Sequence, residues 1–355
     1  MVLPTPRLLS IATAVPPHRV DQATAREAAR ESFGDRAAAF DRLAPVFDNA
    51  GIRTRHVAAP LDWYRASHGW TDKNALYLDV APALLAEAAG RALADAGLEG
   101  RDVDTVVTVG STGIATPGLE SRLIGPLGLR PEVGRVPLFG LGCAGGVLGL
   151  GHAAALARAA PGSTVLLLAV ELCSLAFRPD DTGKASIVAT ALFADGAAAA
   201  VIRAGDGKGT PSRCLAGVPA WGEHTWLGTL DVMGWRVEDA GLGVVFARSI
   251  PDLVRERLAA AADGFLARNG LGRRDLAGII AHPGGTKVLD ALAAAFDLDP
   301  GALAVERSVL ARYGNMSSVT VLFVLAERLA AGARGRHLMT ALGPGFTAGF
   351  ALLEA

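Results

Sequence analysis

One arrangement of segments occurs twice along this 355-residue chain and constrains its fold more than any other sequence feature. The repeated unit is an apolar strand, a glycine-containing turn into an apolar helix, and a second apolar strand. It is predicted at Asp104–Gly110, Val147–Ala159 and Ser163–Val170, and again at Leu276–Ala281, Tyr313–Ala330 and His337–Leu342. Continuous apolar strands alternating with helices are typical of sheets covered on both faces. The sequence therefore predicts an α/β fold built from two duplicated halves.

The duplication also predicts which residues lie together. Asn315 is the counterpart of Cys143, because each stands where the helix of its half begins. The loop at His282 is the counterpart of Ser111-Thr112, because each follows the first strand of its unit. If the two halves pack about a pseudo-two-fold axis, Cys143, His282 and Asn315 converge at one point.

The remaining elements of the first half are predicted from the spacing of apolar residues. They are a strand at Leu8–Val15 and helices at Gln22–Leu43 and Leu76–Leu98, with Gly97 as a C-terminal cap of the latter. The glycine-rich segment Ala204–Ser212 is the clearest linker-like break in the chain. We therefore predict an N-terminal half at residues 1–205 and a C-terminal half at residues 212–355.

The composition argues against several classes of protein. Hydrophobic residues make up 51% of the chain, charged residues make up 19%, and the net charge is −1, which does not favour a nucleic-acid or anionic-membrane partner. Three scattered cysteines indicate neither a disulfide framework nor a metal site. No apolar stretch is long enough to span a bilayer. We expect a cytoplasmic protein without stable membrane insertion.

Cys143 lies in the segment Leu138–Gly151, where an apolar strand runs into glycines and continues as a helix. This strand–turn–helix places the thiol at a helix N-terminus, which favours the thiolate and lowers the thiol pKa. Small residues around the turn leave the sulfur uncovered, as in the nucleophile elbow of hydrolases. The segment alone leaves two interpretations open, a catalytic nucleophile and a buried structural cysteine.

Together with Cys143, His282 and Asn315 form a set suited to acyl transfer with carbon–carbon bond formation. Cys143 would hold an acyl group as a thioester, and His282 as an imidazolium would keep the thiol ionised. The imidazole and the Asn315 amide would stabilise the enolate that forms when a malonyl thioester loses carbon dioxide. Taken singly, His282 also suits a turn residue and Asn315 a helix cap.

Four motifs closely resemble those of the type III polyketide synthases, the chalcone-synthase-like branch of the thiolase fold. They are Gly142-Cys143-Ala144-Gly145-Gly146, Ala191-Leu192-Phe193-Ala194-Asp195-Gly196, His282-Pro283-Gly284-Gly285 and Tyr313-Gly314-Asn315-Met316-Ser317-Ser318. The resemblance extends over nearly the whole chain. It implies a thiolase-like αβαβα layered fold, a homodimer, no metal or redox cofactor, and acyl-CoA and malonyl-CoA as substrates that enter through a narrow tunnel.

The resemblance also implies the roles of individual residues in catalysis. Cys143 matches the acyl-carrying nucleophile, and His282 and Asn315 match the residues that promote decarboxylation and condensation. Phe193 matches a phenylalanine between the CoA tunnel and the active-site cavity. Thr116 matches a position that reaches toward the cavity of the partner subunit.

Other matching positions concern the cavity wall and CoA binding. Cys173 and Ala176 match cavity-lining positions, and a small Ala176 leaves room for a longer or differently folded chain. Arg42 matches a basic residue that contacts the CoA phosphates. Gly284 and Gly285 are expected on the CoA-binding side of the site.

The segments Val170–Ser174 and Leu230–Trp235 look most like those of bacterial enzymes that extend long-chain fatty acyl starters. The expected reaction loads a medium- or long-chain acyl-CoA on Cys143, extends it by decarboxylative Claisen condensation with malonyl-CoA, and cyclises the product to an alkylpyrone or alkylresorcinol. One alternative is an enzyme like β-ketoacyl-acyl-carrier-protein synthase III, although its histidine motif usually reads His-Gln-Ala-Asn. A 3-hydroxy-3-methylglutaryl-CoA synthase needs a glutamate base, for which Glu171 is a poor candidate. A non-catalytic acyl-binding subunit on the same fold is the third alternative.

Overall fold

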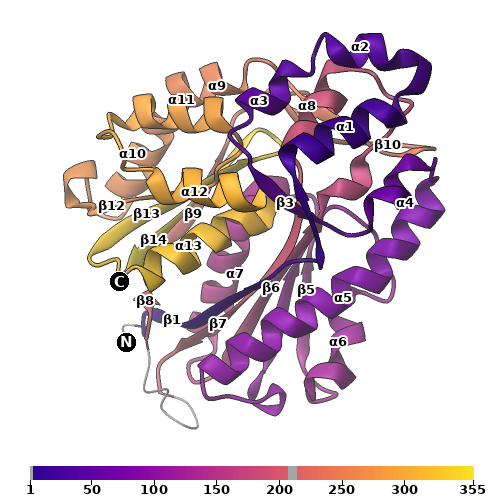
Figure 1. Ribbon diagram of the computed structural model, residues 1–355. Helices are drawn as coiled ribbons and strands as arrows, with labels where there is room; N and C mark the ends of the chain where they lie inside the picture. Colours follow the sequence, from indigo (N-terminus) through magenta and orange to yellow (C-terminus); the bar gives the residue numbers. More distant parts are fainter. Residues whose placement is uncertain (1–2, 207–213) are drawn as a thin grey trace.

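The computed structural model describes residues 3–206 and 214–355, and a mixed ten-stranded sheet forms the centre of this described part (Figure 1). The strands follow the order β12-β13-β14-β8-β1-β7-β6-β4-β5, and β9 pairs with β14. Their bounds are β1 Pro6–Ala14, β4 Thr105–Val109, β5 Gly134–Leu138, β6 Thr164–Leu172, β7 Asp195–Ala204, β8 Ala216–Gly217, β9 Trp221–Thr225, β12 Gly278–Ala281, β13 Arg336–Gly343 and β14 Thr347–Glu354. Two smaller sheets are formed by β2 (His18–Asp21) with β3 (Thr54–Val57) and by β10 (Met233–Glu238) with β11 (Gly241–Phe246).

Helices cover both faces of the sheet and fill the space between its two halves (Figure 1). They are α1 Gln22–Ser32, α2 Ala37–Asp41, α3 Pro45–Asn49, α4 Leu61–Arg65, α5 Trp70–Asp95, α6 Leu119–Leu127, α7 Gly145–Ala159, α8 Lys184–Leu192, α9 Ile250–Leu253, α10 Ala259–Arg268, α11 Thr286–Phe296, α12 Ala304–Tyr313 and α13 Thr320–Ala330. Short 3₁₀ turns precede α7 (η3, Gly142–Ala144) and α13 (η7, Ser317–Val319), and another follows β6 (η4, Cys173–Ala176).

The same topology occurs in both halves of the chain. In the first half β4 runs parallel to β6, and β6 runs antiparallel to β7. In the second half β12 runs parallel to β13, and β13 runs antiparallel to β14. The helix between the two parallel strands is α7 in one half and α13 in the other. The predicted order of strand, helix and strand is therefore present twice.

Three hydrophobic clusters correspond to the spaces between the layers. The middle cluster contains Leu167 of β6 and Met339 of β13 together with residues of α7 and α13. Leu166 of β6 lies in an outer cluster with α5, and Leu338 of β13 lies in another outer cluster with α10 and α11. Successive side chains of a strand point to opposite faces, so each strand contributes to two layers. The result is an αβαβα stack in which α7 and α13 are the inner helices.

The inner helices approach each other most closely at their N-termini. A Cβ atom on Gly146 of α7 would lie 2.2 Å from the carbonyl oxygen of Ser318. Glycine is therefore required there, because any side chain would push the two halves apart. This contact places the start of one duplicated helix beside the start of the other.

Two predicted helices have different bounds in the structure. The helix predicted at Gln22–Leu43 ends at Ser32, because Gly34 has a φ of 52° and cannot continue a right-handed helix. The helix predicted at Leu76–Leu98 starts earlier, at Trp70, and ends at Asp95. Gly97 has a φ of 68°, which confirms its predicted capping role. The predicted linker Ala204–Ser212 lies mostly outside the described residues, so the half boundaries stay predictions.

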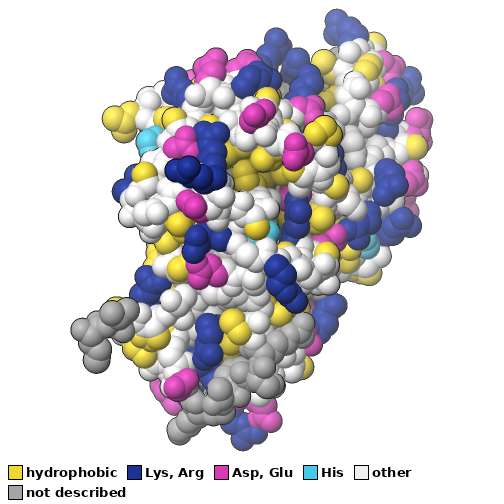
Figure 2. All heavy atoms as spheres, turned by 90° about the vertical axis from the view of Figure 1, so that its left-hand side faces the viewer, with side chains coloured by type: hydrophobic (Ala, Val, Ile, Leu, Met, Phe, Trp, Pro, Cys, Tyr) yellow, Lys and Arg dark blue, Asp and Glu magenta, His cyan; other side chains and the backbone are white. Residues whose placement is uncertain are grey.

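The surface carries charges of both signs. On the face drawn in Figure 2, Lys and Arg side chains are interspersed with Asp and Glu side chains, around a hollow lined by hydrophobic side chains. This distribution agrees with the net charge of −1. Within residues 3–206 and 214–355, none of the helices combines the length and the apolar character needed to cross a bilayer.

Candidate active site

Cys143 lies in the 3₁₀ turn η3, directly before α7, as the glycine-rich sequence predicts. Gly142 has a φ of 50°, and a Cβ atom there would lie 2.5 Å from Cδ of Pro344, so only glycine allows this turn. The cysteine is 8% exposed, and its Sγ donates to Oγ of Ser317 at 3.6 Å. The thiol is thus more buried than the small flanking residues suggest.

Asn315 is held in a single orientation by the backbone around it. Its Oδ1 accepts a hydrogen bond from the amide of Ser317 at 2.9 Å, and its Nδ2 donates to the carbonyl of Gly284 at 3.1 Å. Its backbone amide donates to the carbonyl of Leu192 at 2.8 Å. These contacts leave the second N–H of the side-chain amide for another acceptor.

His282 follows the last residue of β12, and its backbone amide donates to the carbonyl of Thr340 at 2.9 Å. Cys143, His282 and Asn315 line one cavity of about 610 Å³. The structure therefore brings together the three residues that the duplication predicts to converge. Arg42, Gly284 and Gly285, the predicted CoA contacts, line the same cavity.

Further basic residues lie around this cavity besides Arg42. The residues that line it include Lys184 at the start of α8, Arg248 after β11 and Lys287 in α11. The sequence analysis missed these three, because they belong to segments far apart in the chain and no local pattern connects them. A cavity with several cations is suited to a polyanionic ligand.

Arg55 has a structural position that the sequence does not indicate. It is 3% exposed, and its guanidinium donates to the carbonyls of Thr190, Ala191 and Phe193 at 2.6–2.7 Å. These carbonyls lie at the C-terminal end of α8, where a cation is favourable. Arg55 thus holds the segment that carries Phe193.

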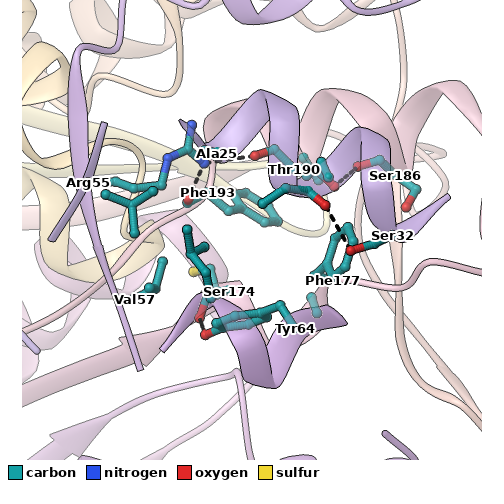
Figure 3. A pocket seen from close by; sticks show the side chains of 17 residues that line it. Ala25, Ser32, Arg55, Val57, Tyr64, Ser174, Phe177, Ser186, Thr190 and Phe193 are labelled. Atoms are coloured by element: carbon teal, nitrogen blue, oxygen red, sulfur yellow. Dashed lines mark hydrogen bonds between the residues drawn. The ribbon is translucent and has the colours of Figure 1, made fainter. Parts of the chain in front are cut away.

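Three predicted cavity residues, Phe193, Cys173 and Ala176, line a second and largely apolar cavity (Figure 3). In Figure 3 the rings of Phe193, Phe177 and Tyr64 surround this space. Leu192, the neighbour of Phe193, and Phe246, whose ring lies 5.7 Å from the ring of Phe193, line the catalytic cavity. Thr116 lines neither of these two cavities and is exposed in the described chain.

The electrostatics of the site differ from the expected thiolate–imidazolium pair. Burial raises the pKa of the Cys143 thiol to about 12, and the carboxyl of Glu171 acts in the same direction. Burial also lowers the pKa of His282 to about 3. Neither imidazole nitrogen has a hydrogen-bond partner among the described residues. The expectation of a lowered thiol pKa is thus wrong for this state, because burial favours the neutral thiol.

Glu171 is a buried carboxyl near the thiol that the sequence analysis treated only as a poor base candidate. It is fully buried at the second-last position of β6 and accepts hydrogen bonds from the amide of Ser111 at 3.0 Å and from Oγ of Ser318 at 2.8 Å. Burial raises the pKa of this carboxyl. Because Ser111 and Ser318 belong to different halves, Glu171 connects the two halves beside the site.

Comparisons with known proteins connect this geometry to a family. Residues 5–206 match the N-terminal domain of chalcone and stilbene synthases, and residues 225–354 match the C-terminal domain. The crystal structure of the 1,3,6,8-tetrahydroxynaphthalene synthase of Streptomyces coelicolor A3(2), a bacterial type III polyketide synthase, superposes with a TM-score of 0.90. The two sequences are 30% identical, and the superposition covers 98% of this chain and 98% of that chain. The chain belongs to the type III polyketide synthases. Family membership confirms the resemblance, the thiolase-like layered fold and the acyltransferase class.

Other members of the family are similar over most of their length. The 1,3,6,8-tetrahydroxynaphthalene synthase of Streptomyces peucetius subsp. caesius is 41% identical over 352 residues, which are 97% of this chain and 92% of that protein. The phloroglucinol synthase of Pseudomonas fluorescens is 32% identical over 320 residues, which are 86% and 87% of the two chains. These type III polyketide synthases differ in the product that their names give.

Proposed function

We propose that this type III polyketide synthase loads an acyl-CoA starter on Cys143 and extends it with malonyl-CoA by decarboxylative Claisen condensation. The observation that carries the proposal is that Cys143, His282 and Asn315 line one cavity. A buried thiol, a buried imidazole without a hydrogen-bond partner among the described residues and a fixed amide are together suited to acyl transfer through a thioester.

In the loading step, Sγ of Cys143 attacks the thioester carbonyl of the starter. The thiol proton passes to a nitrogen of His282, since neither imidazole nitrogen has a hydrogen-bond partner among the described residues. The carbon–sulfur bond to CoA then breaks, and CoA leaves as a thiol after taking this proton. The acyl group remains on Cys143 as a thioester.

In the extension step, malonyl-CoA loses carbon dioxide and the electron pair of the broken carbon–carbon bond forms an enolate. The second N–H of the Asn315 amide, whose first donates to the carbonyl of Gly284, and an N–H of His282 would donate to the enolate oxygen. The enolate carbon attacks the thioester on Cys143, and the sulfur leaves. Every step uses groups of the chain and the substrates, so we propose that no metal or redox cofactor is needed; undiminished activity after treatment with EDTA would support this.

We propose a medium- or long-chain fatty acyl starter and an alkylpyrone or alkylresorcinol product. Two observations support this choice. The catalytic cavity has apolar walls that include Leu43, Val46 and Leu292. The second cavity, next to Cys173 and Ala176, is also mainly apolar. An alkyl chain gains about 0.8 kcal/mol for each CH₂ group that it buries in such surroundings.

A second candidate starter is malonyl-CoA itself. The 41% identical relative is named for 1,3,6,8-tetrahydroxynaphthalene, and another relative for phloroglucinol, neither of which carries an alkyl chain in its name. The same catalytic residues serve either starter, so the site alone does not separate the two candidates.

Mass spectrometry of the products distinguishes the two candidate starters. Purified protein receives malonyl-CoA alone or with acyl-CoA starters from acetyl to stearoyl, and Cys143→Ala serves as the control. Alkylated products that depend on both the acyl-CoA and Cys143 support the fatty acyl proposal. Aromatic products from malonyl-CoA alone support the second candidate. Turnover only with carrier-protein thioesters would contradict both.

A further inference from the structure

The β10–β11 hairpin forms a small sheet of its own beside the candidate site. Its strands pair only with each other among the described residues, from Met233↔Phe246 to Glu238↔Gly241. An isolated two-stranded hairpin is marginally stable in water, so its position depends on contacts with other elements. Trp235, Val244 and Phe246 lie on one side of the hairpin, its inner side, because Trp235 is paired with Val244 and residues two apart on a strand share a face. The contacts with other elements lie on this side and at the tip.

The inner side of the hairpin packs against Phe193, which lines the second cavity. The rings of Trp235 and Phe246 each lie 5.7 Å from the ring of Phe193, centroid to centroid. Val244 is buried in the same cluster as Phe193 and Cys173. A movement of the hairpin would therefore change the space around Phe193.

The tip of the hairpin is fastened by Lys73 of α5. The amine of Lys73 donates to the carbonyl of Ala240 in the turn at 3.3 Å and to the carbonyl of Phe177 at 3.0 Å. Lys73 is only 5% exposed, which is uncommon for a lysine. One buried amine thus connects the hairpin tip to Phe177, whose ring lines the second cavity.

Arg178 forms the second connection at the tip. Its guanidinium pairs with the carboxylate of Glu238, the last residue of β10, and with the carboxylate of Asp180 at 2.8 Å. The Arg178 side chain is 12% exposed, so solvent screens these pairs less than surface ion pairs. Arg236 also pairs with Glu238, at 3.1 Å, but it lies within the hairpin and its side chain is 63% exposed.

We propose that Lys73, Arg178 and Glu238 are positioning residues that hold the β10–β11 hairpin against Phe193 and so limit the length of the polyketide. Lys73 joins the tip of the hairpin to Phe177, and Arg178 joins the end of β10 to the loop before α8. The predicted effect on product length rests on the proposed function. The contacts that fix the position of the hairpin do not depend on the reaction.

The test compares Arg178→Gln with Arg236→Gln, because both arginines pair with Glu238 and only Arg178 connects the hairpin to another segment. In Arg178→Gln, we expect amide hydrogens of β10 and β11 to exchange about tenfold faster, since a charge-assisted contact is lost. We also expect a shift toward products with an additional extender unit, at an unchanged rate of malonyl-CoA decarboxylation. Arg236→Gln should match the wild type in all three measurements.

Lys73→Met provides a second variant in case Arg178→Gln does not fold, and the same shifts are expected. Unchanged hairpin exchange in both variants would overturn the proposal, as would an equal effect of Arg236→Gln. Faster exchange with an unchanged product distribution would overturn the link to product length. If the wild type forms no condensed product, the proposed function fails. The exchange measurement still decides whether Lys73 and Arg178 hold the hairpin in place.

Discussion

At the scale of single residues, the orientation of the Asn315 amide is the most specific feature of the site. Its nitrogen faces the carbonyl of Gly284 and its oxygen faces the amide of Ser317. A carboxylate at this position would place an anionic oxygen against that carbonyl and against the developing enolate. We therefore expect Asn315→Asp to lower malonyl-CoA decarboxylation by about 10²-fold.

The decarboxylation rate is followed by release of labelled carbon dioxide. Ser317→Ala is the matched control, because it removes the hydroxyl that contacts Cys143 and keeps the backbone amide that orients Asn315. It should retain decarboxylation close to the wild-type rate. An Asn315→Asp variant with the wild-type rate would exclude Asn315 from enolate stabilisation.

The basic residues of the catalytic cavity lead to a second prediction at this scale. If Lys184 and Lys287 bind the phosphates of CoA, Lys184→Gln and Lys287→Gln should each raise KM for acyl-CoA about fivefold at low salt and leave kcat unchanged. The effect should shrink as salt is added, because salt screens exposed charges.

Arg255→Gln is the control for general charge effects. Arg255 pairs with Asp252 on the surface and is absent from the lining of the catalytic cavity. Its replacement should leave KM unchanged. Steady-state kinetics at two ionic strengths distinguish the variants, and an equal change in all three would show that the cavity cations do not bind substrate.

At the scale of elements, Asp195 joins three segments near the site. It begins β7, and its carboxylate accepts hydrogen bonds from the amide of Ser174 in η4 at 2.8 Å and from the amide of Ala58 after β3 at 2.6 Å. In Asp195→Asn, the amide nitrogen would face one of these buried donors. We expect the free energy of unfolding to fall by about 2 kcal/mol.

Urea unfolding with a constant m value measures this loss. The same substitution at Asp21, the exposed cap of α1, is the control, because asparagine caps a helix about as well as aspartate. Asp21→Asn should leave the urea midpoint nearly unchanged. Equal midpoints for the two variants would show that Asp195 does not connect the segments energetically.

At the scale of the whole molecule, one edge of the sheet carries exposed apolar side chains. Phe139 follows β5, the edge strand, and is 63% exposed; Ile114 follows the adjacent β4 and is 48% exposed. Thr116, expected near the partner subunit, lies in the same loop as Ile114. We propose that this edge forms the homodimer interface, since exposed aromatic side chains are typical of interfaces.

If this edge forms the proposed dimer interface, Phe139→Asp should give a monomer at micromolar concentration, because a carboxylate at the interface would be desolvated. Size-exclusion chromatography with light scattering measures the change. Leu227→Asp is the control, because Leu227 is 95% exposed but belongs to the other half of the chain. A wild-type monomer, or a dimeric Phe139→Asp variant, would contradict the proposed interface.

Much of the fold and part of the site could be predicted from the sequence. Glycines and apolar runs indicated the turn at Cys143, the cap at Gly97 and the strands of both halves. The break at Gly34 was missed because alanines on both sides continue the helical pattern. Lys184, Arg248 and Lys287 were missed because nothing in their local sequence indicates a common cavity.

Local sequence patterns were enough to predict the two strand–helix–strand units and the positions of Cys143, His282 and Asn315 at the ends of matching elements. These features depend on local patterns of a few residues, which backbone sterics and side-chain periodicity convert into structure. The tertiary structure adds that burial raises the pKa of the Cys143 thiol and lowers the pKa of the His282 imidazole, that Phe193 lines a second cavity, and that Lys73 contacts a distant hairpin. Burial, and with it the pKa, depends on atoms brought together from the whole chain, which no local pattern encodes.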